Sequence, residues 1–285
     1  MTTGKLQAEG FPFRFPAGET QVRIRTTTLQ GMDWALKEVV TFKKLVRNGD
    51  DVMEILLTAD ALRRLGHKRL RLVLPYVPYG RQDRVMVPGE ALGIKVFADL
   101  INSVGFEEVE IWDPHSDVTS ALINNVRVVP QETLMLGMSK LRNFPQDCIL
   151  VCPDAGARKK IMSVAKVLNK TEIVFADKIR DADTGQITGT KLNWQSSTVF
   201  HVGKTTPYDY LIVDDLIDGG KTFIEIAKAI RKDMDGYPSN LYLYVTHGFF
   251  SKGMDELAEH FQGIYVANMM SQDPKVLEHP IVRSR

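Results

Sequence analysis

The sequence predicts an α/β protein of two doubly wound domains, each built on a parallel sheet. Short apolar runs typical of buried strands alternate with segments whose apolar residues recur at helical spacing. This alternation weakens over residues 131–145 and restarts near Asp147. Because alternating strands and helices favour right-handed crossovers and parallel sheets, we expect one domain over residues 1–133 and another over residues 134–285.

The first domain is predicted from two helices and the strands that follow them. The residues that share an apolar helical face are Val52, Ile55, Leu56 and Ala59 in the first helix and Phe97, Leu100, Ile101 and Val104 in the second. Gly105 ends the second helix, as glycine commonly does where the chain leaves a helix. Strands are expected over residues 70–74 and 109–112.

The second domain repeats this order with more strands. They are expected over residues 148–152, 173–175, 210–213, 241–245 and 263–267. The apolar faces of its helices are Ile161, Val164, Ala165 and Leu168, and then Phe223, Ile226, Ala227 and Ile230. Ligands of such sheets gather at the carboxyl ends of the strands, so polar residues that follow a strand are the candidates for function.

Composition limits the classes of function. Of the 285 residues, 44% are apolar, and a net charge of +1 gives no general attraction to nucleic acid or to an anionic membrane. No segment reaches about 18 uninterrupted apolar residues, so we expect no membrane span. We interpret the two cysteines, Cys148 and Cys152, as core thiols, one on each side of residues 149–151. With no disulfide framework and no apolar leader indicated, a reducing, cytoplasmic location is expected.

The most informative segment is the acidic, glycine-rich run that follows the strand over residues 210–213. Two carboxylates come directly after the strand, and a glycine pair opens the next helix. Carboxylates can hold the hydroxyls of a sugar, glycines allow close backbone approach, and a helix N-terminus offers N–H groups to a phosphate. The run therefore predicts a cradle for a ribose 5-phosphate unit rather than an ordinary cap and turn. Its residues are Asp214, Asp215, Asp218, Gly219, Gly220, Lys221 and Thr222.

Two segments of the first domain carry polar side chains after predicted strands. In residues 75–84, Arg81 can pair with phosphate oxygens and Gln82 can contact the polar edge of a ring, although a solvated loop explains this segment equally well. In residues 113–116, His115 lies near a carboxylate and can bind a metal or a phosphate. A lone histidine is more often structural.

Two segments of the second domain carry charged residues in the same way. Asp154 can ligate a metal, hold a sugar hydroxyl or cap the next helix, and these roles are compatible. Lys178 and Arg180 are separated by one residue, so in an extended segment both would face the same side. Two such cations would stabilise charge on a transferring phosphoryl group, whereas the alternative is a solvated run of charges.

Taken together, these segments resemble the ribose-phosphate pyrophosphokinases, also called phosphoribosyl pyrophosphate synthetases. Matches to six segments of this family occur in the family's order, from near Phe15 to near Ala267, and together they are specific although each is weak alone. The matching segments are residues 79–84, 113–115, 153–156, 178–180, 214–222 and 246–248. The resemblance implies two doubly wound parallel-sheet domains of phosphoribosyltransferase-like type, with an ATP side in residues 1–133 and a ribose-phosphate-binding domain in residues 134–285.

The resemblance implies a specific reaction. The β,γ-pyrophosphoryl group of ATP would move to the C1 hydroxyl of ribose 5-phosphate, giving AMP and phosphoribosyl pyrophosphate. Lys178 and Arg180 would stabilise the transition state, and Arg180 would also meet the ribose substrate. The implied ATP-binding residues are Phe15, Glu19, Arg81, Gln82 and His115. The implied ribose 5-phosphate ligands are Arg180, Asp214, Asp215, Asp218, Gly219, Gly220, Lys221 and Thr222.

The resemblance also implies a cofactor and partners. Mg2+ would be bound by His115 and Asp154, directly or through waters, because magnesium bridges phosphate oxygens and uses few protein ligands. The partners would be ATP, ribose 5-phosphate and further copies of the chain in a dimer or hexamer, without nucleic acid or membrane. Ala17 stands where the family has Asp in a segment that reaches the ATP of a neighbouring subunit, which implies altered nucleotide binding. Lys221 adds a cation beside the phosphate.

Two other functions remain open on the sequence. A phosphoribosyltransferase shares the Asp-Asp ribose loop, but it needs only one such domain, so Arg81, Gln82 and His115 argue against it. A non-catalytic regulatory subunit usually has an altered catalytic loop. The presence of Lys178 and Arg180 argues against that function, whereas Ala17 favours it.

Overall fold

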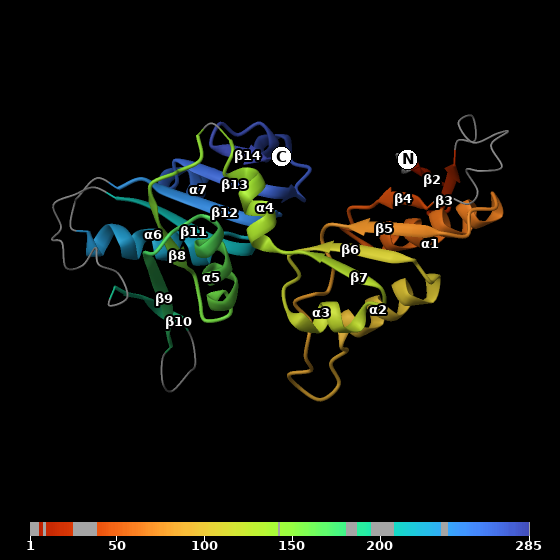
Figure 1. The fold of residues 1–285 in the computed structure, drawn as a ribbon, viewed down its shortest axis with the longest axis horizontal. Helices are drawn as coiled ribbons and strands as arrows, with labels where there is room; N and C mark the ends of the chain where they lie inside the picture. The colour runs from red at the N-terminus through yellow and green to blue at the C-terminus, as the bar shows by residue number, and fades with distance from the viewer. Residues whose placement is uncertain are drawn as a thin grey trace. The chain divides into compact units, whose positions relative to one another are not determined.

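A computed structural model gives the fold of the chain (Figure 1). It describes residues 6–7, 10–24, 39–141, 143–180, 187–194, 208–234 and 239–284. The chain divides into two compact units, Met1–Val129 and Pro130–Arg285, and each unit is described by itself. The sequence suggested a division a few residues later, after residue 133.

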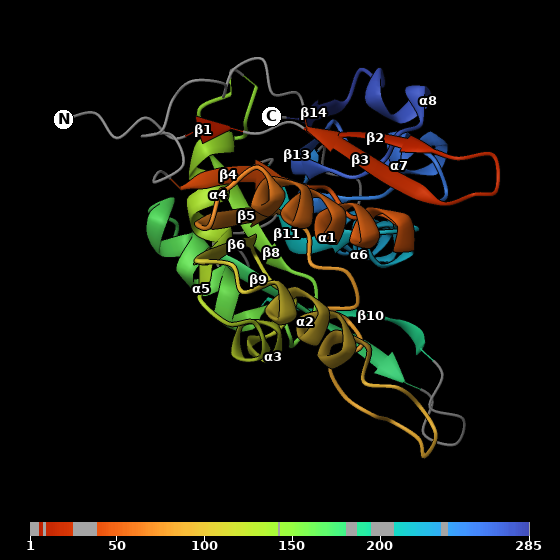
Figure 2. The same cartoon turned by 90° about the vertical axis from the view of Figure 1, so that its right-hand side faces the viewer.

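The first unit contains a five-stranded parallel sheet with strand order β1-β4-β5-β6-β7. Its elements are β1 (Leu6–Gln7), β2 (Gly10–Arg14), β3 (Thr20–Ile24), β4 (Val40–Lys43), α1 (Gly49–Arg64), β5 (Leu70–Leu74), α2 (Gly93–Val104), β6 (Glu108–Trp112), α3 (Asp117–Leu122) and β7 (Val126–Val129). β2 and β3 pair as a separate antiparallel hairpin, in which β3 lies along α1 with Val22 and Ile24 buried (Figure 2). The core of this unit therefore lies between one face of the sheet and α1 and α2.

The two long helices of the first unit begin and end where local chemistry requires. Asn48 and Asp51 form a reciprocal capping box at the start of α1. α2 ends at Gly105, which adopts φ +67°, as the sequence predicted. Its buried residues are Ile94, Phe97, Ala98, Ile101 and Val104. Leu100 was expected on the same face, but it lies at the edge of the apolar stripe and is 41% exposed.

The second unit contains a seven-stranded sheet with strand order β10-β9-β8-β11-β12-β13-β14. Its elements are α4 (Gln131–Met138), β8 (Cys148–Cys152), α5 (Arg158–Val167), β9 (Ile173–Arg180), β10 (Ile187–Asn193), β11 (Asp209–Ile217), α6 (Lys221–Asp233), β12 (Leu241–Gly248), α7 (Asp255–His260), β13 (Gly263–Met269), α8 (Pro274–Leu277) and β14 (Val282–Ser284). All neighbouring strands are parallel except β9 and β10, which are antiparallel. The strand order reverses between β8 and β11, because β9 lies on one side of this pair and β12 on the other.

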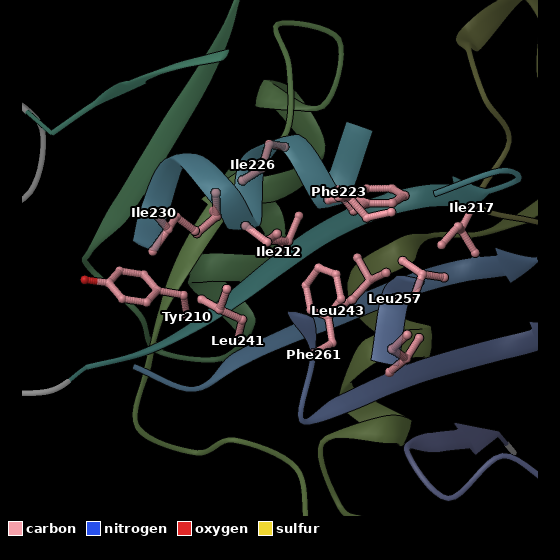
Figure 3. Close-up of a cluster of buried hydrophobic side chains, with 14 of the residues drawn as sticks. Tyr210, Ile212, Ile217, Phe223, Ile226, Ile230, Leu241, Leu243, Leu257 and Phe261 are labelled. Atoms are coloured by element: carbon pink, nitrogen blue, oxygen red, sulfur yellow. The ribbon is translucent and has the colours of Figure 1, made fainter. Parts of the chain in front are cut away.

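Helices cover both faces of this sheet, and the central strands are consequently apolar on both sides. α6 and α7 pack on one face, where Phe223, Ile226 and Ile230 of α6 meet Tyr210 and Ile212 of β11 (Figure 3). The buried residues of α4 and α5 lie outside that cluster and contact the sheet through β8, β12 and β13. The four residues predicted for the apolar face of α6 are all buried.

Four strands of the second unit, β9, β11, β12 and β13, continue beyond their predicted ends, and in β9 and β11 the extension contains candidate site residues. β11 runs to Ile217, because its backbone keeps pairing with β12 as far as Gly248. Asp214 and Asp215 therefore lie within the carboxyl half of the strand rather than after it. β9 runs to Arg180, because β10 pairs with it in an antiparallel hairpin that the sequence analysis did not predict.

The remaining features agree with the predicted class. The fold is α/β with parallel sheets, as predicted. Both cysteines are buried free thiols. None of the helices in the described part of the chain is long and apolar enough to cross a membrane.

Candidate active site

The candidate site of the second unit lies at the carboxyl ends of β8 and β11, where the strand order reverses. The two strands pair from Asp209↔Cys148 to Ile212↔Val151. This register brings Asp154, which follows β8, close to Asp214 in the carboxyl half of β11. In doubly wound sheets the crevice at such a switch point is the usual position of a ligand. The topology therefore brings together two aspartates that are 60 residues apart in the sequence.

The carboxylates at this position form an electrostatically strained cluster. The pKa of Asp214 is raised well above its ordinary value, chiefly because its carboxyl is desolvated and because the negative charges of Asp215 and Asp154 lie near it. The N–H of Asp215 opposes this shift by donating to Asp214 Oδ1 at 2.9 Å. Lys160 of α5 faces the cluster, with Nζ 3.6 Å from Asp215 Oδ2. A cationic or hydroxyl-bearing ligand would relieve the repulsion within the cluster.

Asp154 also shapes the turn in which it lies. Its Oδ1 accepts the N–H groups of Gly156 and Ala157 at 2.9 and 3.2 Å, just before α5 begins. Asp154 therefore forms an Asx-type turn ahead of α5. The capping role that the sequence offered as an alternative is wrong, because the N-cap residue of α5 is Ala157 and no side chain caps the helix. Because this turn uses Oδ1, it fixes the direction in which the carboxylate presents its other oxygen.

The ribose-phosphate loop, residues 218–222, is tied to the turn after β12. Phe249 N–H donates to the carbonyl of Ile217 at 2.9 Å, and Ser251 N–H donates to that of Asp218 at 3.1 Å. Gly220 has φ +80°, and a Cβ at this position would lie 3.0 Å from Cδ2 of Leu257. Glycine is therefore required here both for its backbone conformation and for space. This loop is fixed by backbone bonds on one side and by the α7 core on the other.

The start of α6 has the geometry of an anion site. No side chain caps the helix, and the N–H groups of Phe223 and Ile224 donate to the carbonyl of Gly220 at 3.0 and 3.2 Å. α6 has 13 residues, so the aligned peptide dipoles of several turns favour a negative charge at its N-terminus. Lys221 is exposed and Thr222 is half-buried at this end. The arrangement suits a phosphate group.

The candidate ATP-binding residues of the first unit lie in two segments, residues 81–84 and residues 113–116, and the carboxylate of Asp83 lies between them. Asp83 follows Arg81 and Gln82, and its side chain is 5% exposed. Its pKa is lowered chiefly by the hydrogen bonds that Arg84 donates to it, and the charge of His115 lowers it further. The segments around residues 81–84 and 113–116 are therefore adjacent, as the predicted sheet requires.

Gln82 is fixed against the start of α2. Its N–H donates to the carbonyl of Tyr79 at 2.8 Å, and its own carbonyl accepts Ile94 N–H at 3.4 Å. A Cβ at Gly93 would collide with the Gln82 side chain, so the glycine leaves the space that the amide occupies. Tyr79 adopts φ +61°, a left-handed conformation that is unusual for a non-glycine residue. The turn before Arg81 and Gln82 is therefore strained, as is common at functional sites.

The sequence of this chain is similar to those of known proteins of one family. The family model described as the N-terminal domain of ribose phosphate pyrophosphokinase matches residues 11–105. A ribose-phosphate pyrophosphokinase of Haemophilus ducreyi is 32% identical over 244 residues, which cover 84% of this chain and 70% of that protein. One of Thermococcus kodakarensis is 30% identical over 243 residues, which cover 85% of this chain and 79% of that protein.

The chain belongs to the ribose-phosphate pyrophosphokinase family. A crystal structure of phosphoribosylpyrophosphate synthetase from Mycobacterium smegmatis superposes with a TM-score of 0.74 over 98% of this chain and 86% of that one. Because the two sequences are only 22% identical, this similarity supports the fold alone. The predicted family and the predicted phosphoribosyltransferase-type fold are both confirmed.

The family's Phe-x-x-Gly-Glu segment forms the turn of the β2–β3 hairpin. Phe15 N–H donates to the carbonyl of Glu19, and Gly18 N–H donates to that of Phe15, both at 2.8 Å. Phe15 is 46% exposed, and Glu19 is exposed as well. Ala17 lies at this turn. The segment therefore presents Phe15 and Glu19 on the surface, where a ligand can reach them.

The catalytic pair that the family resemblance implies lies at the end of β9. The backbones of Lys178 and Arg180 pair with Thr190 and Ile187 of β10. Their side chains and residues 181–186 lie outside the described part of the structure. The roles of Lys178 and Arg180 remain predictions.

Among the residues that the structure describes, no group of three or more His, Cys, Asp or Glu side chains is arranged to hold a metal ion. Magnesium is usually held by one or two carboxylates together with waters and substrate phosphates. The strained carboxylates at Asp154 and Asp214 fit that mode, because a cation would offset their repulsion. His115 and Asp154, the two predicted ligands, belong to different units.

Two residues that contact the candidate site were not predicted from the sequence. Gln131 is 2% exposed, and its Nε2 donates to the backbone carbonyl of Asp214 at 2.8 Å. Lys160 faces Asp215. His247, which belongs to the matching segment 246–248, is buried, with Nδ1 3.0 Å from Asn268 Nδ2 across the β12–β13 pair. No local pattern points to Gln131 or Lys160, since each comes from a helix that is distant in sequence from the strand it supports.

Proposed function

We propose that the protein transfers the pyrophosphoryl group of ATP to the C1 hydroxyl of ribose 5-phosphate, giving AMP and phosphoribosyl pyrophosphate. The observation that carries this proposal is the ribose-phosphate loop at the topological switch point of the second unit, in a chain that belongs to the pyrophosphokinase family. The hydroxyl oxygen at C1 forms a bond to the β-phosphorus of ATP. The bond from that phosphorus to the oxygen shared with AMP breaks, and the hydroxyl proton is lost.

The second unit supplies the ribose side in this proposal. Asp214 and Asp215 accept hydrogen bonds from the ribose hydroxyls, which replaces mutual repulsion by favourable contacts. The 5-phosphate lies against the N-terminus of α6, where residues 218–222 provide backbone N–H groups and Lys221 a positive charge. Gly219 and Gly220 allow the backbone to approach the phosphate. Binding at both ends of the sugar orients its C1 hydroxyl.

The first unit supplies residues for ATP. Arg81 pairs with phosphate oxygens, and Gln82, held in place beside Gly93, contacts the adenine edge. Phe15 and Glu19 on the exposed hairpin turn bind the ATP of a neighbouring copy, so the proposal includes a homo-oligomer. A cytoplasmic location, expected from the two buried thiols, belongs to the same proposal.

Lys178 and Arg180 stabilise the transition state in this scheme. Negative charge redistributes over the phosphoryl oxygens during the transfer, and two fixed cations lower the energy of that state more than that of the bound substrate. His115 in the first unit and Asp154 in the second are the residues that would bind Mg2+, directly or through waters, and the cation would supply charge neutralisation at the ATP phosphates. Asp154 is already oriented for such a role by its two backbone hydrogen bonds.

The alternative functions have less support. A phosphoribosyltransferase would not need the first unit, over most of which the family model of the pyrophosphokinase N-terminal domain matches. A regulatory subunit would not need Lys178 and Arg180, which the chain has at the end of β9.

The proposal is tested by incubating the purified protein with ATP, Mg2+ and ribose 5-phosphate. We expect AMP and phosphoribosyl pyrophosphate in equal amounts. Lys178→Ala should lower the turnover by about 10²-fold or more, because a donor of positive charge to the transition state is lost. Lys166→Ala, which removes an exposed lysine from the end of α5, is the matched control and should leave the turnover unchanged. Pyrophosphate release from phosphoribosyl pyrophosphate and a base, without AMP formation from ATP, would identify a transferase instead.

A further inference from the structure

The turn that follows β12 carries a lysine against the ribose-phosphate loop. This turn, residues 249–253, is held by the backbone bonds from Phe249 to Ile217 and from Ser251 to Asp218. A further bond from Gly253 N–H to the carbonyl of Phe250, at 2.9 Å, closes the turn. Phe250 is 3% exposed and adopts φ +55°, so its ring anchors the turn in the core of the second unit. The backbone of Lys252 is therefore held in place by the hydrogen bonds of this turn.

The stem of Lys252 lies directly over Gly219. A Cβ at Gly219 would be 3.2 Å from Cγ of Lys252, closer than ordinary contacts of a side chain. Gly219 does not have a positive φ, so backbone strain does not explain a glycine at this position. The missing side chain instead leaves the space in which the lysine stem crosses the loop. The two residues are 33 positions apart in the sequence.

The charge of Lys252 has no described use within the protein. Lys252 is exposed, and no other described side chain forms an ion pair or hydrogen bond with its ammonium group. Lys228, which is exposed on α6, differs in this respect, because its Nζ lies 3.6 Å from Oε1 of Glu225 and 3.8 Å from Oε1 of Glu256. An ammonium group whose stem contacts Gly219 would add to the positive potential of the α6 dipole at that end of the helix.

We propose that Lys252 binds the 5-phosphate of the sugar substrate together with the N–H groups at the start of α6. This inference rests on the proposed function, because that function assigns the phosphate to residues 218–222. Lysine binds phosphate as a point charge on a flexible stem, so it needs only a fixed stem near the anion. The contact with Gly219 provides that position. Lys252 then determines affinity for the phosphorylated sugar and contributes nothing to the recognition of ribose itself.

The test measures binding of ribose 5-phosphate by calorimetry, which does not depend on turnover. Lys252→Met retains an apolar stem of similar length and removes the charge. We expect its Kd for ribose 5-phosphate to rise about 10-fold, as for the loss of a hydrogen bond between charged groups. Lys252→Arg should stay close to the unmodified protein. The KM for ATP should not change in either variant.

A matched control removes a lysine from the C-terminal end of α6, the end far from the ribose-phosphate loop. Lys232 is exposed in the last turn of α6, about 16 Å along the helix from Lys221. Lys232→Ala lowers the net charge by the same amount as Lys252→Met and should leave the Kd for ribose 5-phosphate unchanged. An equal loss of affinity in the two variants would mean a general charge effect and would overturn the assignment.

A second variant tests the contact through which the stem is positioned. Gly219→Ala should displace the stem of Lys252 and raise the Kd about 3-fold, since the added methyl group would lie 3.2 Å from its Cγ. In the Lys252→Ala background no Cγ remains, so the same change at Gly219 should have no further effect. Additive effects in this double-mutant cycle would contradict the proposed contact.

The outcomes separate this inference from the proposed function. Binding of ribose 5-phosphate that weakens in Lys252→Met supports the inference whether or not AMP is formed from ATP. Formation of phosphoribosyl pyrophosphate together with an unchanged Kd in Lys252→Met overturns the inference and leaves the proposed function in place. Failure of the unmodified protein to bind ribose 5-phosphate overturns both.

Discussion

Gly220 is the position of the ribose-phosphate loop at which one methyl group should be costly. Its φ of +80° lies in the left-handed region, and its carbonyl accepts the N–H groups of Phe223 and Ile224 in the first turn of α6. A Cβ there would lie 3.0 Å from Cδ2 of Leu257, a core residue that is 3% exposed. Gly220→Ala therefore combines backbone strain with overpacking.

The costs of backbone strain and of overpacking can be added to estimate how much Gly220→Ala lowers the free energy of unfolding. A non-glycine residue in the left-handed conformation costs roughly 1–2 kcal/mol. Moving Leu257 away from a contact well inside the carbon–carbon optimum of about 3.5–4.0 Å costs roughly a further 1 kcal/mol, because its neighbours are close-packed. We expect Gly220→Ala to lower the free energy of unfolding of the second unit by about 2–3 kcal/mol. The Kd for ribose 5-phosphate should rise as the N–H groups of α6 shift.

Gly253→Ala is the control for this prediction. Gly253 has a similar φ of +77°, but a Cβ there would meet nothing within 4 Å. This variant therefore carries the backbone cost alone, and the difference between the two variants isolates the contact with Leu257. Urea unfolding followed by circular dichroism and by tryptophan fluorescence measures both. An unfolding midpoint of Gly220→Ala equal to that of the unmodified protein, or above that of Gly253→Ala, would refute the reasoning.

Two further predictions concern buried titratable groups. His67 is 0% exposed, neither ring nitrogen has a hydrogen-bond partner among the described residues, and burial lowers its pKa below the ordinary 6.5. The unfolded chain binds the proton more tightly, so stability should fall as the pH drops below 6.5, and His67→Leu should flatten the dependence of urea midpoints between pH 7 and pH 5. The contribution of Asp214 to stability changes with pH in the opposite direction. Because the pKa of Asp214 is raised in the folded state, this stability is lost as the pH rises through that pKa. Asp214→Asn should therefore stabilise the second unit by roughly 0.5–2 kcal/mol at pH 7 while weakening ribose 5-phosphate binding, and a variant that is destabilised or that binds the sugar as well as before would contradict this.

Much of the fold could be predicted because apolar periodicity reports burial directly. The strand over residues 148–152 has five buried residues in a row and was found at its predicted bounds. The face of α6 was predicted correctly for the same reason. The hairpin of β2 and β3 was missed although its apolar residues alternate, with Phe11 and Phe13 in β2 and Val22 and Ile24 in β3.

The ends of the strands at the site could not be predicted from that periodicity. β11 continues through Asp214 and Asp215 because backbone pairing with β12 does not depend on apolar side chains. In the same way β9 continues to Arg180 by pairing with β10. Apolar periodicity predicts the buried part of a strand, whereas the residue at which the strand ends depends on backbone pairing with a neighbouring strand. Functional residues gather at these strand ends, so their local structure was the least predictable part.

The residues that support the site were hidden for a related reason. Asp214 and Gly220 were identified because they belong to a continuous run of informative residues. Gln131 and Lys252 act through contacts across 83 and 33 residues of sequence, and each looks like an ordinary polar residue in its own segment. Such long-range contacts become visible only when the register of the sheet is known.

The hydrogen bond from Gln131 to the carbonyl of Asp214 affects how the second unit can be handled in isolation. Gln131 is the first residue of α4 and follows the unit boundary by only two positions. A fragment that starts at residue 134, where the sequence suggested a boundary, would lack this amide and would leave a backbone acceptor beside the acidic cluster without its donor. Expression of the second unit for crystallisation or screening should therefore begin no later than Pro130.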